Sequence, residues 1–318
     1  MNENQKGSTA MPYVEQFQPI HLSQVQALVN AHIGALVPGW ALPEAYIASQ
    51  LQRDPGEYVV DPWVTTRVTL CAIERQRVVA VAHLLRYGSG VEVGPAYRNN
   101  GEIAWLLAWP DAGDHAAALL KAAGDQFVRW GSVEVWALET CLPAGPFAGL
   151  PDAWPHIAVA LIGAGYRRNP SGARDEAIFG GSIKQIELPT TPIVGLNIQR
   201  TTGRFGTRFS AGLDGQTVGD CECIADLTNG GALPALRGWG ELAELEVRAP
   251  WRNCGIGTWL VQNALAWLRL GGCTRIVLSV TAEDEAAGAG RFYRRFGWDT
   301  LVQFQRGWAL TREQEHQQ

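Results

Sequence analysis

The sequence predicts an α/β (α+β) fold with two tandem domains, each a mixed, mostly antiparallel sheet flanked by helices. Runs of alternating apolar residues between turn signals mark the strands, and apolar residues spaced three and four apart mark the helices. The order of these elements occurs twice along the 318 residues, on either side of a segment with Pro189 and Pro192. This repetition indicates a duplicated domain, and we expect the domains at 1–188 and 189–318.

The composition is typical of a globular protein with substantial cores. Hydrophobic residues make up 47% of the chain and include 13 Trp, while only 18% of the residues are charged, which excludes a disordered chain. The formal net charge is −5 without a long basic run, so we expect neither nucleic acid nor an anionic membrane as a partner. No apolar run is long enough to span a bilayer and residues 1–11 are polar, which favours a cytoplasmic protein.

The cysteines and histidines do not follow the spacing of a metal site. The six cysteines are scattered along the chain, and the six histidines form no ligand pattern. We therefore expect free thiols and no bound metal. The cysteines are Cys71, Cys141, Cys221, Cys223, Cys254 and Cys273.

The first half is expected to begin with a strand and two helices. Pro38 and Gly39 separate the two helices, and the polar segment 74–77 provides the turn of a hairpin. A strand, a long helix, a second strand, a helix and a last strand follow. The expected ranges are strand 13–20, helices 21–36 and 42–53, hairpin 64–86, strand 103–109, helix 114–130, strand 133–138, helix 154–164 and strand 177–186.

The second half repeats this order without the two early helices. Asp214-Gly215 joins two strands and is a strong hairpin signal. When 135–138 is placed opposite 277–280, the long helices of the two halves align without a gap. The expected ranges are strands 193–201, 207–213, 217–226 and 241–247, helix 255–270, strand 275–280, a short helix around residue 292 and strand 300–309.

One junction between a strand and a helix in the second half carries most of the chemical information. The strand ends at Val247, and the helix begins at Gly255 and Gly257. A helix N-terminus presents unpaired N–H groups and a partial positive charge, which suit a pyrophosphate. Glycine lets a phosphate approach the backbone closely, and Arg252 can add a charge-assisted contact. A tight turn without a ligand is the alternative interpretation of the two glycines.

A second motif lies one strand later, in the segment 290–298. It contains an aromatic-Tyr-x-x-x-Gly-aromatic pattern, and the earlier junction contains Arg-x-x-Gly-x-Gly preceded by Leu-x-Val. Both patterns resemble the GNAT superfamily of N-acetyltransferases, closely over about 241–298 and by element order over most of the chain. One departure is Ala286, where the family often has Asn. The matching residues are Leu245, Val247, Arg252, Gly255, Gly257, Phe292, Tyr293, Gly297 and Trp298.

The resemblance implies acetyl-CoA, or a related acyl-CoA, as the co-substrate and no metal. The backbone around Leu245–Val247 would pair with the pantetheine arm between two splayed strands, and the turn after it would hold the pyrophosphate. Tyr293 would protonate the departing CoA thiolate, which suits a phenol with an unperturbed pKa near ~10. A core aromatic residue is the alternative interpretation of Tyr293. The expected acyl-CoA-binding residues are Leu245, Glu246, Val247, Arg252, Asn253, Cys254, Gly255, Ile256, Gly257 and Thr258.

An attacking amine must lose a proton, because an ammonium group has no lone pair. In related enzymes a carboxylate, often acting through water, serves as the base. Glu241 and Glu244 are the candidates on the expected strand, although each is also compatible with an ordinary strand carboxylate. Strand alternation places Glu244 and Glu246 on one face and Glu241 on the other, unless a β-bulge intervenes.

The first half lacks the residues that carry this chemistry. In the alignment of the long helices, Pro110, Gly113 and His115 stand opposite Arg252, Gly255 and Gly257, and Leu161 stands opposite Tyr293. Asp111 and Asp114 would also repel a phosphate. We interpret the first half as a degenerate GNAT-like domain without acyl transfer of its own.

The resemblance thus implies an N-acetyltransferase that moves an acetyl group from acetyl-CoA to an amine by direct attack in a ternary complex. The acceptor would be a small-molecule or peptide amine, and the oligomeric state stays open. A non-catalytic acyl-CoA-binding sensor or scaffold is the alternative, and another acyl donor or acceptor is also open. Because the second half lacks the early helices, we hypothesise that the first domain forms part of the acceptor wall, with loop 91–101 as a candidate contributor.

Overall fold

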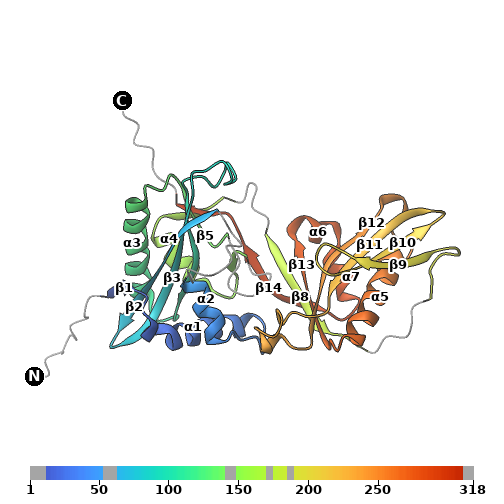
Figure 1. Ribbon diagram of the computed structural model, residues 1–318, viewed down its shortest axis with the longest axis horizontal. Coiled ribbons are helices and arrows are strands. Elements are labelled where there is room, and N and C mark those ends of the chain that lie inside the picture. Colours follow the sequence, from blue (N-terminus) through green and yellow to red (C-terminus); the bar gives the residue numbers. More distant parts are fainter. Residues whose placement is uncertain (1–11, 53–62, 140–147, 170–174, 185–189, 311–318) are drawn as a thin grey trace, which may run out of the picture. The chain divides into compact units, whose positions relative to one another are not determined.

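The protein consists of two compact units, each with one sheet and helices packed on it (Figure 1). The computed structural model describes residues 12–52, 63–139, 148–169, 175–184 and 190–310. The first unit comprises 1–35, 42–173 and 305–318, and the second comprises 36–41 and 174–304. The chain therefore leaves each unit and returns to it, so neither unit is one continuous stretch of sequence.

The first unit begins as predicted, with a short strand and two helices before a long hairpin. Its sheet has the strand order β1-β2-β3-β4-β5-β15-β7, and β4 and β5 form a parallel pair. The elements are β1 (Tyr13–Gln16), α1 (Leu22–Leu36), α2 (Glu44–Leu51), β2 (Val64–Glu74), β3 (Arg77–Tyr87), β4 (Gly101–Ala108), α3 (Gly113–Trp130), β5 (Val135–Ala137), β6 (Leu150–Pro151), α4 (Pro155–Gly163), β7 (Tyr166–Arg168) and β15 (Trp308–Leu310). A short 3-10 helix, η1, covers Pro19–His21.

The second unit repeats the arrangement of strands without the early helices. Its strands run in the order β14-β8-β13-β12-β11-β10-β9, and β12 and β13 form a parallel pair. The elements are β8 (Glu176–Ser182), β9 (Asn197–Thr202), β10 (Thr207–Leu213), β11 (Gln216–Ile224), η2 (Pro234–Leu236), β12 (Trp239–Val247), η3 (Ala249–Trp251), α5 (Ile256–Leu270), β13 (Arg275–Thr281), α6 (Ala282–Ala287), α7 (Ala289–Arg294) and β14 (Asp299–Gln305).

Helix α5 forms the core of the second unit against strands β10, β11 and β12 (Figure 1). Its apolar stripe includes Trp259, Leu260 and Leu268, which are buried. Cys221 and Cys223 of β11 face the same core, as their spacing on a strand requires. The structure describes five of the six cysteines, and these five are free thiols; Cys141 lies outside the described residues.

The hairpin predicted at Asp214-Gly215 is confirmed. Leu213 pairs with Gln216, and the two turn residues have φ angles of 49° and 77°. Positive φ at both central positions defines the turn type that matches the twist of two antiparallel strands. The turn sets the register of β10 against β11 as far as Gly212, and a register shift between Ala211 and Gly212 sets it for the remaining pairs.

Each unit contains one strand from the other half of the sequence. Strand β8 precedes the linker, yet it lies antiparallel between β13 and β14 in the second sheet. Strand β15 ends the described chain and lies antiparallel between β5 and β7 in the first sheet. The predicted boundary between 188 and 189 follows chain order, whereas the compact units exchange these two strands.

The single strand predicted at 300–309 is wrong. The structure has β14 in one sheet and β15 in the other, and the chain turns between them at Arg306-Gly307, where Gly307 has a φ of 81°. Alternating apolar residues continue across this turn in the sequence, which explains the wrong prediction. Only the left-handed backbone at Gly307 separates the two strands.

Candidate functional site

Strands β12 and β13 diverge beside the start of α5. They pair in parallel only at Trp239, Gly240 and Glu241. Strand β12 continues to Val247, and its other edge is paired with β11. Beyond Glu241 the edge of β12 that faces β13 has no partner strand among the described residues. This gap offers backbone donors and acceptors to an extended ligand.

The turn that follows β12 is shaped to bind an anion. Asn253 and Gly255 have φ angles of 63° and 83°, and Gly255 is the N-cap of α5. The first N–H groups of the helix, from Ile256 onward, have no partner within the helix. Left-handed residues directly before a helix turn successive N–H groups toward one point, where the helix dipole adds partial positive charge.

Arg252 lies at the same turn and is held in place. Its Nε donates to the carbonyl oxygen of Val247 at 2.9 Å, while the side chain stays exposed. The remaining guanidinium N–H groups are thus positioned beside the helix start. Cys254 is also exposed, and its thiol donates to the carbonyl oxygen of Arg252 at 3.4 Å.

Packing within the protein does not require glycine at position 257, whereas a bound ligand would. A Cβ at this position would lie 3.6 Å from Val247 and 3.7 Å from Phe292, which are ordinary packing distances. The protein itself therefore tolerates a side chain there, and close approach of a phosphate gives a reason for glycine. The turn, the helix start and Arg252 together fit the pyrophosphate of an acyl-CoA.

Tyr293 lies on α7 with its ring buried in an aromatic cluster. The ring stacks on Trp298 with centroids 6.0 Å apart and meets Phe292 edge-on at 5.1 Å. Among the described residues no hydrogen bond engages its hydroxyl. Burial, with smaller contributions from Cys221 and Asp284, raises the pKa of Tyr293 above its usual range. The phenol therefore stays protonated and can act as a proton donor.

A β-bulge changes the predicted placement of the three glutamates. Leu242 pairs with Cys223 and Glu244 pairs with Glu222, so Ala243 is the extra residue of β12. Residues opposite each other in an antiparallel pair share a face. The exception that the sequence analysis allowed for a β-bulge therefore applies, and Glu241 shares a face with Glu244 and Glu246. All three carboxylates lie on the sheet face away from α5, because the extra residue Ala243 shifts the alternation of side chains along β12 by one position.

Glu241 and Glu244 differ in environment. Glu241 is the last residue of the parallel pairing with β13, so it lies where the gap opens. Burial raises the pKa of Glu241 above its usual range. The side chain of Glu244 is 51% exposed, and its carboxylate lies 3.6 Å from Arg208. Of the two candidates, Glu241 lies where the two strands separate and is the less exposed.

Glu222 and Arg208 form a buried polar group that the sequence analysis missed. The side chain of Glu222 is fully buried and accepts hydrogen bonds from Arg208 and from the backbone N–H groups of Arg204 and Phe205, the latter at 3.2 and 2.9 Å. Burial opposes the charge of Glu222, but these donors outweigh it and hold its pKa below the usual range. The Asp214-Gly215 turn alone would place Cys221 opposite Arg208; the register shift between Ala211 and Gly212 places Glu222 there instead.

The first sheet contains the same bulge with a different use of its carboxylate. Ile103 pairs with Leu84 and Trp105 with His83, so Ala104 is the extra residue of β4. Glu102 thus stands two residues before the bulge, as Glu241 does in β12. The side chain of Glu102 is fully buried and accepts a hydrogen bond from the Tyr87 hydroxyl at 2.5 Å.

Loop 91–101 helps to bury the carboxylate of Glu102 within the first unit. The ring of Tyr97 packs against Tyr87, Trp136 and Trp63, with centroids 5.1 to 5.4 Å apart. These aromatic rings lie on the same side as the carboxylate of Glu102, because Glu102 and Trp136 pair across β4 and β5. Two of these ring partners, Trp63 and Trp136, are more than 30 residues from Tyr97 in the sequence, so the sequence contains no local signal for the contacts.

The first unit also lacks space for the anion-binding turn. Four residues (109–112) connect β4 to α3, whereas eight (248–255) connect β12 to α5. At the end of β4, Nε2 of His156 lies 3.0 Å from the carbonyl oxygen of Ala108. In the first unit the carbonyl oxygen at the end of β4 is therefore already engaged by the imidazole of His156, whereas the end of β12 borders the open gap.

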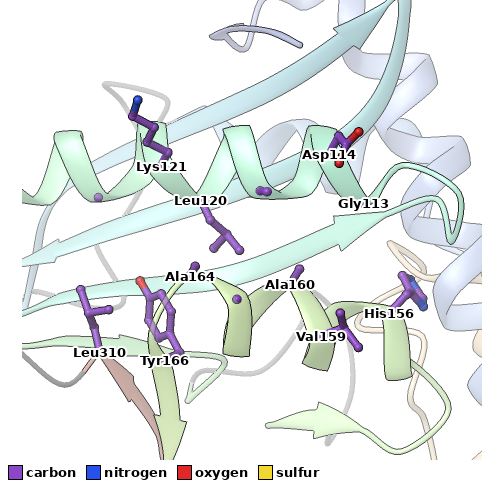
Figure 2. A pocket seen from close by; sticks show the side chains of 13 residues that line it. Gly113, Asp114, Leu120, Lys121, His156, Val159, Ala160, Ala164, Tyr166 and Leu310 are labelled. Atoms are coloured by element: carbon purple, nitrogen blue, oxygen red, sulfur yellow. The ribbon is translucent and has the colours of Figure 1, made fainter. Parts of the chain in front are cut away.

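A hollow of about 660 Å³ lies between α3 and α4 of the first unit (Figure 2). Leu120 and Tyr166 point into this space, while Asp114 and Lys121 project from the far side of α3 (Figure 2). Its walls are mostly apolar, with Ala160 and Ala164 among them. No converging set of cationic groups is present in this part of the described chain, so the hollow does not resemble a pyrophosphate site.

A model of the acetyltransferase (GNAT) family matches residues 190–298. The C-terminal domain belongs to the GNAT family. The matched range includes the gap between β12 and β13, the turn before α5 and Tyr293, but not β8. No curated protein matches the sequence. The family and the fold support acyl transfer in general.

Solved GNAT structures share the fold of nearly the whole chain. One is a GCN5-related glucosamine N-acetyltransferase region of a fungal multi-domain GH3 β-N-acetylglucosaminidase, with 15% identity and a TM-score of 0.60 over 95% of this chain and 38% of that one. Another is a tandem GNAT protein of the clavulanic acid biosynthesis pathway, with 12% identity and a TM-score of 0.58 over 94% and 98%. A GCN5-related N-acetyltransferase from Sphaerobacter thermophilus has 15% identity and a TM-score of 0.58 over 94% of each chain.

These similarities show that the chain has the tandem GNAT fold, as the sequence predicted. The chain spans about 38% of the length of the fungal protein, and nearly the full length of the other two. No helix in the described part of the chain is long and apolar enough to cross a membrane. Within the same residues, no three His, Cys, Asp or Glu side chains are grouped to hold a metal ion.

Proposed function

We propose that the C-terminal GNAT domain transfers an acyl group, acetyl in the first instance, from acyl-CoA to an amine. The observation that carries the proposal is the open edge of β12, which leads directly to the anion-binding turn and α5. Only this unit combines such an edge with an eight-residue turn at 248–255 among the described residues. The acceptor class that we propose is a small-molecule or peptide amine.

The residues of the turn bind and orient the co-substrate. Backbone groups of Leu245–Val247 pair with the amide-containing pantetheine arm, and the N–H groups from Asn253 to Thr258 hold the pyrophosphate with Arg252. When bound, acyl-CoA supplies an activated thioester with a thiolate leaving group. Fixing both reactants in one site converts a bimolecular reaction into one between neighbours, which lowers the barrier.

Glu241 and Tyr293 move the protons in this proposal. Glu241, directly or through water, takes a proton from the ammonium group of the acceptor, so that the nitrogen lone pair can attack the thioester carbonyl carbon. The new C–N bond forms while the C–S bond breaks, and the Tyr293 hydroxyl donates its proton to the departing sulfur. The nitrogen then loses its second proton to water, which leaves a neutral amide, and the Tyr293 phenolate regains a proton from water. A raised pKa makes Glu241 a better base, and the raised pKa of Tyr293 keeps the phenol protonated until the thiolate departs.

Turnover distinguishes the enzyme from a non-catalytic acyl-CoA sensor. The assay would follow free CoA and the acylated product by mass spectrometry, with acetyl-CoA and a panel of primary amines. We expect product with at least one amine, and Tyr293→Phe should lower kcat about 100-fold with little change in KM. Binding of acetyl-CoA without turnover on any amine would support a role as a non-catalytic sensor. Turnover only with a longer acyl-CoA would show that the donor is not acetyl-CoA.

A further inference from the structure

Strand β8, which precedes the linker, contributes Phe179 to the surroundings of Tyr293. Phe179 is fully buried, and its ring centroid lies 6.2 Å from that of Tyr293 with an angle of 48° between the rings. On the strand, Phe179 pairs with Leu278 of β13 and with Thr300 of β14. A side chain anchored between two strands offers a fixed surface to the phenol ring.

The same strand supports Tyr293 a second time through Trp298. A Cβ at Gly181 would lie 2.7 Å from Cδ1 of Trp298, so the indole rests directly on the backbone of β8. Trp298 in turn stacks on Tyr293 with an angle of 22° between the rings. Strand β8 therefore limits the phenol ring both directly, through Phe179, and through the indole.

The helices that carry Tyr293 are also tied to the segment of β8. Glu176 accepts a hydrogen bond from the Ser279 hydroxyl at 2.9 Å, and the carbonyl oxygen of Asp175 accepts one from the N–H of Ala282 at 2.8 Å. The guanidinium group of Arg294, the neighbour of Tyr293, lies 5.2 Å from the ring centroid of Phe179. These contacts fix α6 and α7 relative to β8.

We propose that Phe179 is a positioning residue for Tyr293. The inference rests on the proposed function, in which the Tyr293 hydroxyl donates a proton to sulfur. Phe179 does not reach the reacting atoms; it prevents the phenol ring from tilting, and a displacement of about 1 Å in such a group can lower the rate about 100-fold. The GNAT family match begins at residue 190, so a residue outside the matched range completes the site.

A double-mutant cycle on kcat tests this role. Phe179→Leu should lower kcat about tenfold, because the ring gains freedom, while the KM for acyl-CoA changes by less than about twofold. In the Tyr293→Phe background the same substitution should cause no further loss, since the hydroxyl is already absent. Phe209→Leu is the matched control, a buried aromatic of the same core without a ring contact to Tyr293. Equal losses from Phe179→Leu in both backgrounds would overturn the proposal.

A second readout does not depend on turnover. In spectra of isotope-labelled tyrosine, of which the chain has seven, Tyr293→Phe assigns the Tyr293 resonance. Phe179→Leu should shift or broaden this resonance and Phe209→Leu should not; an unmoved resonance would overturn the positioning role. If the wild-type protein acylates no amine but Phe179→Leu shifts the Tyr293 resonance, the proposed function fails while the contact between Phe179 and Tyr293 is supported. Phe179→Met has nearly the volume of Phe179→Leu but a more flexible side chain that fills irregular gaps, and it replaces that variant should it not fold.

Discussion

Glu241 and Glu102 occupy equivalent positions in the two sheets, each two residues before the alanine of a β-bulge. Glu102 is fully buried and accepts a hydrogen bond from Tyr87, whereas Glu241 is half-buried at the opening between β12 and β13. The same scaffold position thus carries a sealed carboxylate in the first unit and an accessible one in the second. This difference supports catalysis in the second unit alone.

Glu241→Gln should lower kcat/KM about 100-fold, because the base is lost. The pH profile supplies the sharper test. A base works when deprotonated, so wild-type activity falls as pH drops through the pKa of Glu241, which burial raises above its usual range. The variant should lack this acid limb. Asp220→Asn, on the same face, is the control and should retain it; an acid limb that persists in Glu241→Gln would direct attention to Glu244.

The same substitution should stabilise the fold at neutral pH. Because the pKa of Glu241 is raised in the folded protein, the folded state binds the proton more tightly than the unfolded chain. The charged carboxylate therefore costs stability once the pH exceeds the unfolded pKa of about 4.3. Thermal unfolding should show Glu241→Gln above wild type at neutral pH, with the difference shrinking as pH falls through the raised folded pKa and vanishing below the unfolded value. A lower midpoint for the variant at neutral pH would show that the charge is stabilised by the fold.

Gly255→Ala and Gly257→Ala should separate folding from binding. Gly255 has a φ of 83°, so alanine should cost about 1–2 kcal/mol of folding free energy. Gly257 lies in the first turn of α5 with ordinary space for a Cβ, so alanine should leave the midpoint unchanged or raise it. Acetyl-CoA binding should nevertheless weaken about tenfold in Gly257→Ala, through the lost close approach. Unimpaired binding in that variant would place the pyrophosphate elsewhere.

Arg208→Gln should destabilise the second unit, because it leaves the buried carboxylate of Glu222 without its charged partner. The pKa of Glu222 is lowered in the folded state, so its contribution is present above the unfolded pKa of about 4.3 and is lost as pH falls. Urea unfolding at neutral pH and in acid would measure both effects. Glu222→Gln should show less loss of stability on acidification than wild type, and an equal loss would exclude Glu222 as its source.

A chain cut between Thr190 and Thr191 should remain one particle. Both residues are exposed, so an inserted protease site there would be accessible. After cleavage, β8 still belongs to the N-terminal piece and β15 to the C-terminal piece, and each completes the sheet of the other unit. The two pieces should elute together on gel filtration and separate only in denaturant. Separation in native buffer would contradict the exchange of strands.

The local signals in the sequence predicted most elements and the acyl-CoA motif. Turn chemistry identified the Asp214-Gly215 hairpin, and the glycines before α5 identified the anion-binding turn. Both features depend on neighbouring residues only, so a single sequence contains the information. The GNAT family model matches residues 190–298, in agreement with the family that the motif indicated.

The features that were missed depend on contacts between distant residues. Strand β8 has the composition of any buried strand, and nothing in it specifies that it pairs with β13 and β14 rather than with its sequence neighbours. The bulge at Ala243 follows from pairing with β11, and small residues give no local sign of a bulge. The roles of Phe179 and of Glu222 with Arg208 follow from these pairings.

Calorimetric titration of acetyl-CoA into the intact protein tests the central claim most directly. We predict one binding site per chain, abolished by Arg252→Glu through charge reversal at the turn before α5. We expect no second site in the first unit, because its turn before α3 has only four residues and the carbonyl oxygen of Ala108 is already bonded. The number of sites per chain therefore tests this assignment. Two sites per chain would contradict the assignment of a single working site. No binding at ~1 mM acetyl-CoA, which corresponds to a binding free energy weaker than about −4 kcal/mol, would contradict acetyl-CoA as the co-substrate.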